Sequence, residues 1–193
     1  MNYLLSLLIP TLPSRGCTTY PKLLDILLPQ VSLRNDVELL SLLDNKSNII
    51  GEKRNKLLGI SKGRYFAFID DDDRVSSDYV KSIVETIIQH PGVDLVLFDS
   101  LYTKAGKPPR TTYFGLEIPK IKHYCDRMES PPCHINVWRK DLVVHVQFPE
   151  IGFGEDRIWQ TEVCKLAKTF ARIPKTLYFY DDNPLTSETQ GHK

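Results

Sequence analysis

The run from Tyr65 to Asp73 constrains the fold most strongly, because an apolar, aromatic segment ends abruptly in four consecutive aspartates. Such a run predicts a buried strand followed directly by carboxylates. If the chain stays extended, side chains alternate, with Asp70 and Asp72 on one side and Asp71 and Asp73 on the other. Two carboxylates facing one spot repel each other unless a cation joins them. Oxygen ligands suit Mg²⁺, Mn²⁺ or Ca²⁺ rather than zinc.

A second interpretation of the acidic run is a solvated loop. Asp71 and Asp73 would then face water, and either Asp73 or Ser76 would cap the helix that follows. Position favours the ligand site, because ligands of open α/β sheets gather at the carboxyl ends of the strands.

Composition narrows the class of protein. A chain of 193 residues with 41% hydrophobic residues predicts one globular domain with a sizeable core. The formal net charge is +1 and the basic residues are dispersed, so we expect no nucleic-acid partner. The apolar run from Tyr3 to Leu12 is short and broken by Pro10, which predicts a first strand and no transmembrane segment. Widely spaced cysteines predict neither a zinc motif nor a disulfide scaffold, and favour a reducing, cytosolic compartment; they are Cys17, Cys125, Cys133 and Cys164.

Hydrophobic periodicity predicts alternating strands and helices, and hence an α/β fold with a mixed, mainly parallel central sheet flanked by helices. The expected strands are residues 4–9, 37–43, 65–69, 93–98, 111–116 and 171–180. The expected helices are residues 23–28, ending near Pro29, then 51–62, 78–90 with Ile88 on its inner side, and 155–167. Residues 93–98 and 111–116 are expected to form an antiparallel hairpin. No shift in composition marks a second domain.

Two helix starts carry charges of interest. Lys53 and Arg54 oppose the dipole at the start of their helix, which favours an anion there, with phosphate as the natural candidate. Simple solvation of the two side chains is the alternative. Two glycines precede Glu155 and Asp156, a pattern typical of a flexible loop that enters a helix with a favourable acidic start.

Five fragments of the chain, taken together in their order and spacing, resemble the family-2-like inverting group of GT-A nucleotide-sugar glycosyltransferases. They are Ser6-Leu7-Leu8-Ile9-Pro10-Thr11, Leu43-Asp44-Asn45, Lys53-Arg54-Asn55, Phe68-Ile69-Asp70-Asp71-Asp72-Asp73 and Gly154-Glu155-Asp156. The resemblance implies a GT-A, Rossmann-like fold over residues 1–193, with a nucleotide-binding half to about residue 100 and an acceptor-binding, catalytic half after it. The compact size is also similar to that of a glycosyltransferase domain in a large viral protein, which implies the host cytoplasm and is compatible with a longer polypeptide.

The same resemblance implies a donor site for a UDP-sugar. Residues beside the base, ribose and phosphates would be Pro10, Thr11, Arg15, Asp44, Lys53, Arg54, Asp70 and Asp71. Asp72, with Asp70, would hold Mn²⁺ or Mg²⁺, and Asp73 would be a further helper. Many relatives supply a histidine ligand after the last strand, where this chain has Asp181, Asp182 and Asn183.

On the acceptor side, the resemblance implies that Asp156 is the general base and that Glu155 orients the loop or the acceptor. Weaker candidates for the acceptor surface are His134, Trp138, Arg157 and Trp159. A lone histidine is more often structural, and a tryptophan in a helix more often belongs to the core.

The function expected is metal-dependent, inverting transfer of a hexose or deoxyhexose from a UDP-sugar to a hydroxyl of a glycan or glycoprotein. A sugar nucleotidyltransferase is one alternative, although residues 10–15 lack the glycine-rich composition that cradles a triphosphate. A non-catalytic calcium- and glycan-binding module is another, although it would need no anion site at Lys53 and Arg54.

Overall fold

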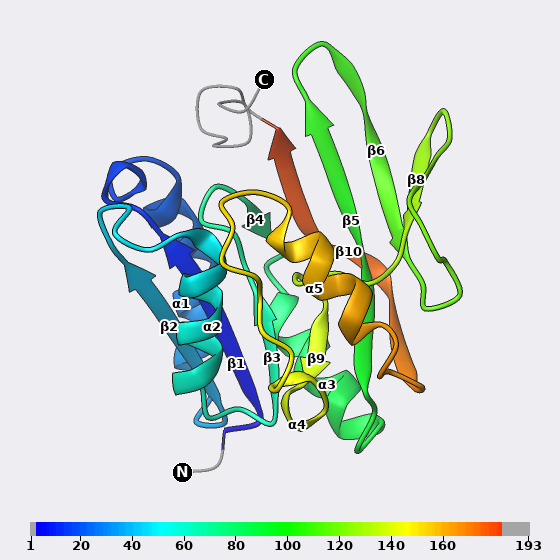
Figure 1. Cartoon of the computed structure of the whole chain (residues 1–193), viewed down its shortest axis with the longest axis horizontal. Coiled ribbons are helices and arrows are strands. Elements are labelled where there is room, and N and C mark those ends of the chain that lie inside the picture. Colours follow the sequence, from blue (N-terminus) through cyan, green and yellow to red (C-terminus); the bar gives the residue numbers. More distant parts are fainter. Residues whose placement is uncertain (1–2, 183–193) are drawn as a thin grey trace.

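Strand β1 (Leu5–Thr11) is the centre of the parallel part of the sheet, and all seven of its residues are buried. It pairs in parallel with β2 (Val37–Leu43) on one side and with β3 (Tyr65–Phe68) on the other. The computed structural model describes residues 3–182, and Figure 1 shows these strands side by side. A strand buried on both faces needs apolar residues at consecutive positions, which is why the sequence predicted β1 and β3. Strand β2 lies at the edge of the sheet and is only partly buried.

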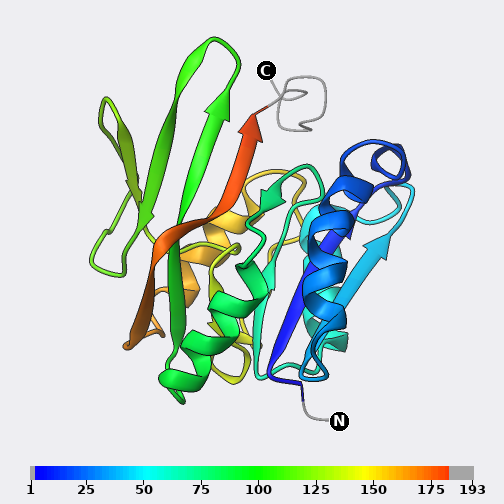
Figure 2. The same ribbon diagram turned by 180° about the vertical axis from the view of Figure 1, so that it is seen from behind.

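Helices cover both faces of this sheet. Helices α2 (Ile50–Ile60) and α5 (Glu155–Val163) lie over the face seen in Figure 1, and α1 (Thr19–Ser32) and α3 (Tyr79–Gln89) lie over the opposite face (Figure 2). The prediction that α3 buries one apolar side is confirmed, except that Ile88, which was expected on that side, is 62% exposed. Within residues 3–182, no helix combines the length and the apolar character that crossing a bilayer requires.

The second half of the sheet is mixed. Strand β5 (Leu95–Lys104) pairs in parallel with β10 (Phe170–Asp182) and antiparallel with β6 (Lys107–Phe114). The three-residue strand β9 (Val137–Arg139) runs antiparallel to both β3 and β5 and joins the two halves. Short elements complete the fold: the 3₁₀ helix Pro13–Arg15, β4 (Arg74–Val75), β7 (Lys122–His123), β8 (Arg127–Ser130) and α4 (Lys140–Val143). They and β9 are too short for periodicity to predict.

Several predicted boundaries are wrong. Strand β5 continues to Lys104 instead of ending at residue 98. Helix α1 continues through Pro29 to Ser32, because Gln30 donates its side-chain amide to Ile26 and Ser76 carbonyls and accepts from the Val80 N–H, which anchors the last turn. Helix α5 ends at Val163 rather than near residue 167. Strand β6 begins earlier than residue 111, directly after the Ala105-Gly106 turn.

An aromatic cluster connects the two halves of the sheet from inside. Trp138 of β9 and Trp159 of α5 are fully buried, and the Trp159 ring stacks on Phe148 with centroids 4.6 Å apart. The indole N–H of Trp138 donates to the Cys133 carbonyl, and that of Trp159 donates to the Val146 carbonyl. Both tryptophans are therefore core residues, and the expectation that they present a face to an acceptor is corrected.

Gly51 allows α2 to approach the loop before α5, because a Cβ at this position would collide with the Pro149 carbonyl oxygen. Gly59, near the end of the same helix, has no atom within 4 Å of such a Cβ. We expect Gly51→Ala to lower the free energy of unfolding by about 1–3 kcal/mol, as overpacking does. Gly59→Ala should raise it by about 0.5–1 kcal/mol, because alanine is the better helix former.

Urea unfolding followed by circular dichroism measures both changes. Equal effects of the two substitutions would show that the contact between Gly51 and Pro149 does not limit the packing of α2.

Candidate active site

The four aspartates lie at the carboxyl edge of the parallel strands, but the chain does not stay extended there. Strand β3 ends at Phe68, and the Asp73 N–H donates to the Asp70 carbonyl at 3.1 Å, which closes a turn. As a result Asp71 and Asp72 both contact Nη1 of Arg15, each at 2.8 Å. The predicted alternation of the four carboxylates is wrong, because the turn replaces the strand on which it depended.

Asp71 fixes the loop that follows β1. Its carboxylate accepts hydrogen bonds from the Thr11 hydroxyl at 2.7 Å, the Leu12 N–H at 3.3 Å and Arg15. Pro10 lies within β1 opposite Leu42 and is buried. The predicted base- and ribose-binding residues of the first loop are thus held against the aspartate turn.

Asp72 is the carboxylate best suited to a cation. Burial and the neighbouring Asp70 raise the pKa of Asp72 to about 6, although Arg15 opposes the shift. A divalent cation would compensate the buried charge, and Mg²⁺ is commonly held by one or two carboxylates together with substrate phosphates. Asp72 and Asp70 supply the type of oxygen ligand that such a site uses, and the two oxygens of Asp70 are paired with Arg54 and His134.

In the described part of the chain, the end of the last strand brings no third ligand to that pair. Asp181 pairs with Arg74, and Asp182 accepts from the Tyr102 hydroxyl and from Lys104. Asn183 lies outside the described residues. Within residues 3–182, no cluster of three or more histidine, cysteine, aspartate or glutamate side chains has the arrangement of a complete metal cage.

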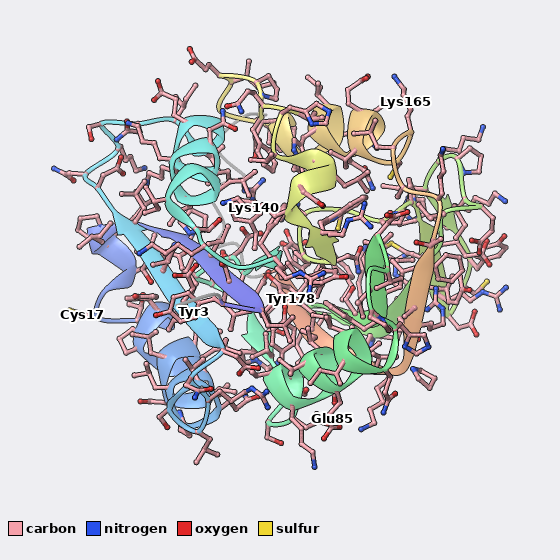
Figure 3. The ribbon with its side chains drawn as sticks, turned by 90° about the horizontal axis from the view of Figure 1, so that it is seen from below. Tyr3, Cys17, Glu85, Lys140, Lys165 and Tyr178 are labelled. Carbon is pink, nitrogen blue, oxygen red and sulfur yellow. The ribbon has the colours of Figure 1, made fainter. Side chains whose placement is uncertain are left out.

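Asp73 is held from inside the fold. Its carboxylate accepts a hydrogen bond from the Tyr178 hydroxyl at 2.7 Å. The hydroxyl oxygen of Tyr178 in turn accepts from the Asp70 N–H at 3.1 Å. Tyr178 belongs to β10 and lies in the interior of the molecule (Figure 3). Burial and the charge of Asp70 raise the pKa of Asp73 well above its ordinary value. Tyr178 thus fixes the end of the aspartate turn, a contact that no local pattern in the sequence indicates.

Arg54 forms the central ion pairs of the site. Its Nη1 lies 2.5 Å from Oε1 of Glu155, and its Nη2 lies 3.0 Å from Oδ1 of Asp70. The guanidinium carbon also lies 5.7 Å and 5.6 Å from the ring centroids of Phe68 and Phe148. Only 4% of the side chain is exposed. Burial opposes ionisation of Asp70, but Arg54 and His134 outweigh it and lower the pKa of Asp70.

Asn55 supports this arrangement from the next position of α2. Its side-chain amide exchanges two hydrogen bonds of 2.8 Å with the backbone of Phe148. The loop that carries Phe148 is thereby held over Arg54. The sequence analysis included Asn55 in a motif but did not predict this contact, because its partner lies 93 residues away.

Lys53 and Asp44, two of the predicted nucleotide-binding residues, neutralise each other's charge. Their side chains form an ion pair, and Lys53 also donates to the Thr11 carbonyl at 3.1 Å. Although burial opposes the change, hydrogen bonds from Lys53 and Asn48 lower the pKa of Asp44 to about 2. In this structure the anions beside Lys53 and Arg54 are carboxylates of the chain itself, and the phosphate contact stays a prediction.

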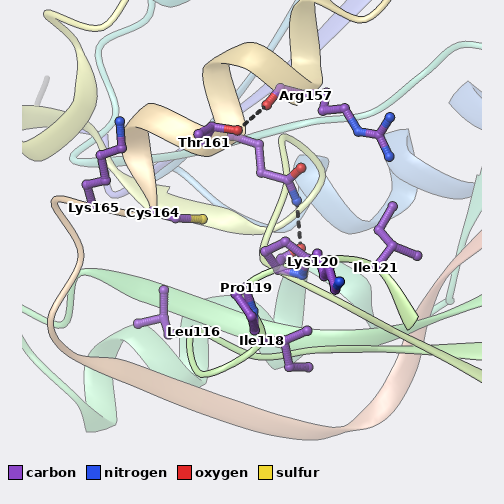
Figure 4. Close-up of a pocket in the computed structure, with 11 residues that line it drawn as sticks. Leu116, Ile118, Pro119, Lys120, Ile121, Arg157, Thr161, Cys164 and Lys165 are labelled. Atoms are coloured by element: carbon purple, nitrogen blue, oxygen red, sulfur yellow. Dashed lines mark hydrogen bonds between the residues drawn. The ribbon is translucent and has the colours of Figure 1, made fainter. Parts of the chain in front are cut away.

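His134 lies between Asp70, a predicted donor-side residue, and Asp156, the predicted base. Its Nε2 is 3.3 Å from Oδ2 of Asp70, and its Nδ1 is 3.5 Å from Oδ2 of Asp156. Asp156 begins α5 after Gly154, whose φ of +81° suits glycine, and its side chain is 39% exposed. The imidazole is buried, so the predicted base and the aspartate turn share one neighbour. Arg157, the next residue of α5, is exposed and lines a pocket beside this helix (Figure 4).

The family of this chain is shown by its sequence. The model of Glycosyl transferase family 2 matches residues 35–142, more than half of the chain, so the chain belongs to this family. The match includes Asp44, Lys53, Arg54 and the aspartate turn, whereas Asp156 lies beyond it. A search of the curated proteins gave no match.

Solved structures agree on the fold. TarS 1-349 from S. aureus in complex with UDP-GlcNAc has a TM-score of 0.70 at 17% identity, covering 98% of this chain and 61% of that one. Glucosyl-3-phosphoglycerate synthase from Mycobacterium tuberculosis, in complex with Mn²⁺, UDP-glucose and phosphoglyceric acid, has a TM-score of 0.63 at 16% identity, covering 98% and 75%. The chain therefore spans about three fifths of the TarS fragment. The predicted GT-A fold is confirmed.

Removal of the buried guanidinium leaves Glu155 and Asp70 without their common partner. We expect Arg54→Met to lower the free energy of unfolding by about 3–5 kcal/mol, because an uncompensated buried charge is costly. Arg127→Met should cost at most about 1 kcal/mol, because the pair between Arg127 and Glu129 is exposed.

Urea denaturation at neutral pH measures both variants. A loss below about 1 kcal/mol for Arg54→Met would mean that desolvation cancels the stabilisation from the two ion pairs.

Proposed function

We propose that the chain is a metal-dependent, inverting glycosyltransferase that moves a hexose or deoxyhexose from a UDP-sugar to a hydroxyl of a glycan or glycoprotein. The observation that carries this proposal is the shared neighbour of two groups, because His134 lies 3.3 Å from Asp70 and 3.5 Å from Asp156. A donor-side carboxylate and a half-exposed carboxylate suited to a base thus flank one imidazole. Membership of the glycosyltransferase family supports the same reaction class.

The donor would bind across the carboxyl ends of β1, β2 and β3. Thr11, Arg15 and Asp44 would contact the ribose and the base, with uracil as the expected base, since the TarS complexes and glucosyl-3-phosphoglycerate synthase bind UDP or UDP-sugars. Lys53 would exchange part of its pairing with Asp44 for the nucleotide. Asp70 and Asp72 are the residues that would hold Mn²⁺ or Mg²⁺, which would stabilise the charge of the departing diphosphate.

Asp156 would act as the general base. Its carboxylate would take the proton of the acceptor hydroxyl while that oxygen attacks the anomeric carbon from the face opposite the diphosphate, which inverts the configuration. His134, 3.5 Å from the Asp156 carboxylate, would hold that group beside the donor-side aspartates. Glu155 is occupied by Arg54, so its role is to hold the start of α5 in place. All four cysteines are free, in keeping with the proposed reducing, cytosolic compartment.

Calorimetric titration of UDP tests the donor site. We expect binding in the presence of Mn²⁺, a loss of at least about tenfold in affinity with chelator, and a similar loss in Asp72→Asn, because that carboxylate would hold the cation. The control is Asp141→Asn on α4, whose side chain is 78% exposed and remote in sequence from the aspartate turn.

This titration and an assay for pyrophosphate release separate the alternatives. Binding of Ca²⁺ without any binding of UDP would replace the transferase by a calcium module. Release of pyrophosphate from UTP and a sugar phosphate would identify a nucleotidyltransferase.

Substitution of the base separates binding from chemistry. We expect Asp156→Asn to keep the affinity for UDP within about twofold while transfer falls by a factor of about 10²–10⁴, the usual contribution of a general base. Glu162→Gln, on the same helix with a side chain 51% exposed, is the matched control and should leave both quantities unchanged. Initial rates of UDP release and UDP titration measure the two effects, and undiminished transfer in Asp156→Asn would remove Asp156 from this role.

A further inference from the structure

A pocket of about 340 Å³ lies between α5 and the loop that follows β6 (Figure 4). Its volume is within the range of about 300–1,000 Å³ that is usual for small-molecule sites. The α5 side is lined by residues spaced as one face of a helix and of the turn that continues it, namely Arg157, Gln160, Thr161, Cys164 and Lys165. The facing wall is largely apolar, formed by Leu116, Ile118, Pro119 and Ile121, together with Lys120.

Positive charge is concentrated on this pocket. Lys165 is paired with Glu162 at 2.7 Å, and its ammonium group points away from the cavity in Figure 4. Arg157 and Lys120 form no ion pair with any carboxylate in the described part of the chain. Both side chains are exposed, and two unpaired cations on the walls of one pocket would attract an anion placed between them.

The pocket also offers a fixed polar group. Gln160 is only 8% exposed, and its amide N–H donates to the Pro131 carbonyl at 2.7 Å. That bond orients the side chain and leaves the amide oxygen without a donor among residues 3–182. An acceptor held in place on a pocket wall and without an internal donor suits a hydroxyl group of a ligand.

The pocket begins one helical turn from the proposed base. Gln160 follows Asp156 by four positions on α5, so their Cβ atoms are neighbours at roughly 5–6 Å along the helix surface. Arg157 follows Asp156 directly in the chain. A molecule anchored in the pocket can therefore extend a hydroxyl group towards Asp156.

We propose that this pocket binds the acceptor, and that the acceptor is a glycan with an anionic substituent, a phosphate or a carboxylate, next to an apolar surface. Arg157 and Lys120 bind the anion, Gln160 accepts from a hydroxyl, and the apolar wall contacts a sugar face or an aglycone. The assignment of the ligand as the acceptor rests on the proposed transferase function. The assignment of an anion-binding site rests on the pocket alone.

Three matched probes test the pocket by calorimetry: p-nitrophenyl β-D-glucoside, which is neutral, p-nitrophenyl β-D-glucuronide, and p-nitrophenyl β-D-glucoside 6-phosphate. We expect at least one anionic probe to bind about tenfold tighter than the neutral one, and the tighter of the two identifies carboxylate or phosphate as the substituent. Arg157→Gln and Lys120→Gln should each reduce this preference at least about fivefold. Lys122→Gln, two residues beyond Lys120, exposed and outside the pocket, should leave it unchanged.

Equal affinity for neutral and anionic probes would overturn the proposal, as would a preference that survives in both pocket variants. Each titration is repeated with saturating UDP and Mn²⁺, which excludes competition at the donor site. Absence of UDP binding together with an Arg157-dependent preference would reject the transferase function and retain the anion site. UDP binding without any charge preference would do the reverse.

Discussion

The buried guanidinium of Arg54 is the interaction on which the rest of the site depends. A charge removed from water must be paired, and Arg54 meets this requirement with Glu155, 101 residues away, and with Asp70. Helix α2, the turn after β3 and the start of α5 are therefore fixed relative to one another by a single side chain. The rings of Phe68 and Phe148 beside the guanidinium exclude water, and weaker solvent screening strengthens both ion pairs.

The need to pair buried charges also gives each of the four aspartates a different partner. Asp70 belongs to the Arg54 pair, Asp71 holds the loop after β1, and Asp73 is fixed by Tyr178. Asp72 keeps a partner in Arg15 but carries a pKa of about 6, because burial and Asp70 both disfavour its charge. An added cation would compensate the charge of Asp72, which agrees with its proposed place in donor binding.

The short strand β9 explains how the second half of the chain reaches the first. It lies between β3 and β5, and Trp138 on this strand packs edge-on against Trp159 of α5. The segment leading into β9 carries His134, whose carbonyl accepts from the Phe68 N–H at 3.2 Å. Sheet pairing and aromatic packing together thus place the imidazole beside Asp70 and Asp156, and the pocket on α5 is built against the same core.

The sequence by itself determined the parallel strands β1, β2 and β3, the helices α2 and α3, and the position of the aspartates at a carboxyl edge, because hydrophobic periodicity and turn residues act over a few neighbouring positions. Tertiary structure alone decided the direction of each aspartate side chain. The strand ends at Phe68 and a turn follows, so the side chains do not alternate as they would in an extended chain. Tertiary structure also decided that Trp138 and Trp159 are core residues, that Lys53 and Arg54 meet carboxylates of the chain, and that Arg157 lines a pocket. These features depend on contacts between residues far apart in the chain, and no local pattern encodes such a partner.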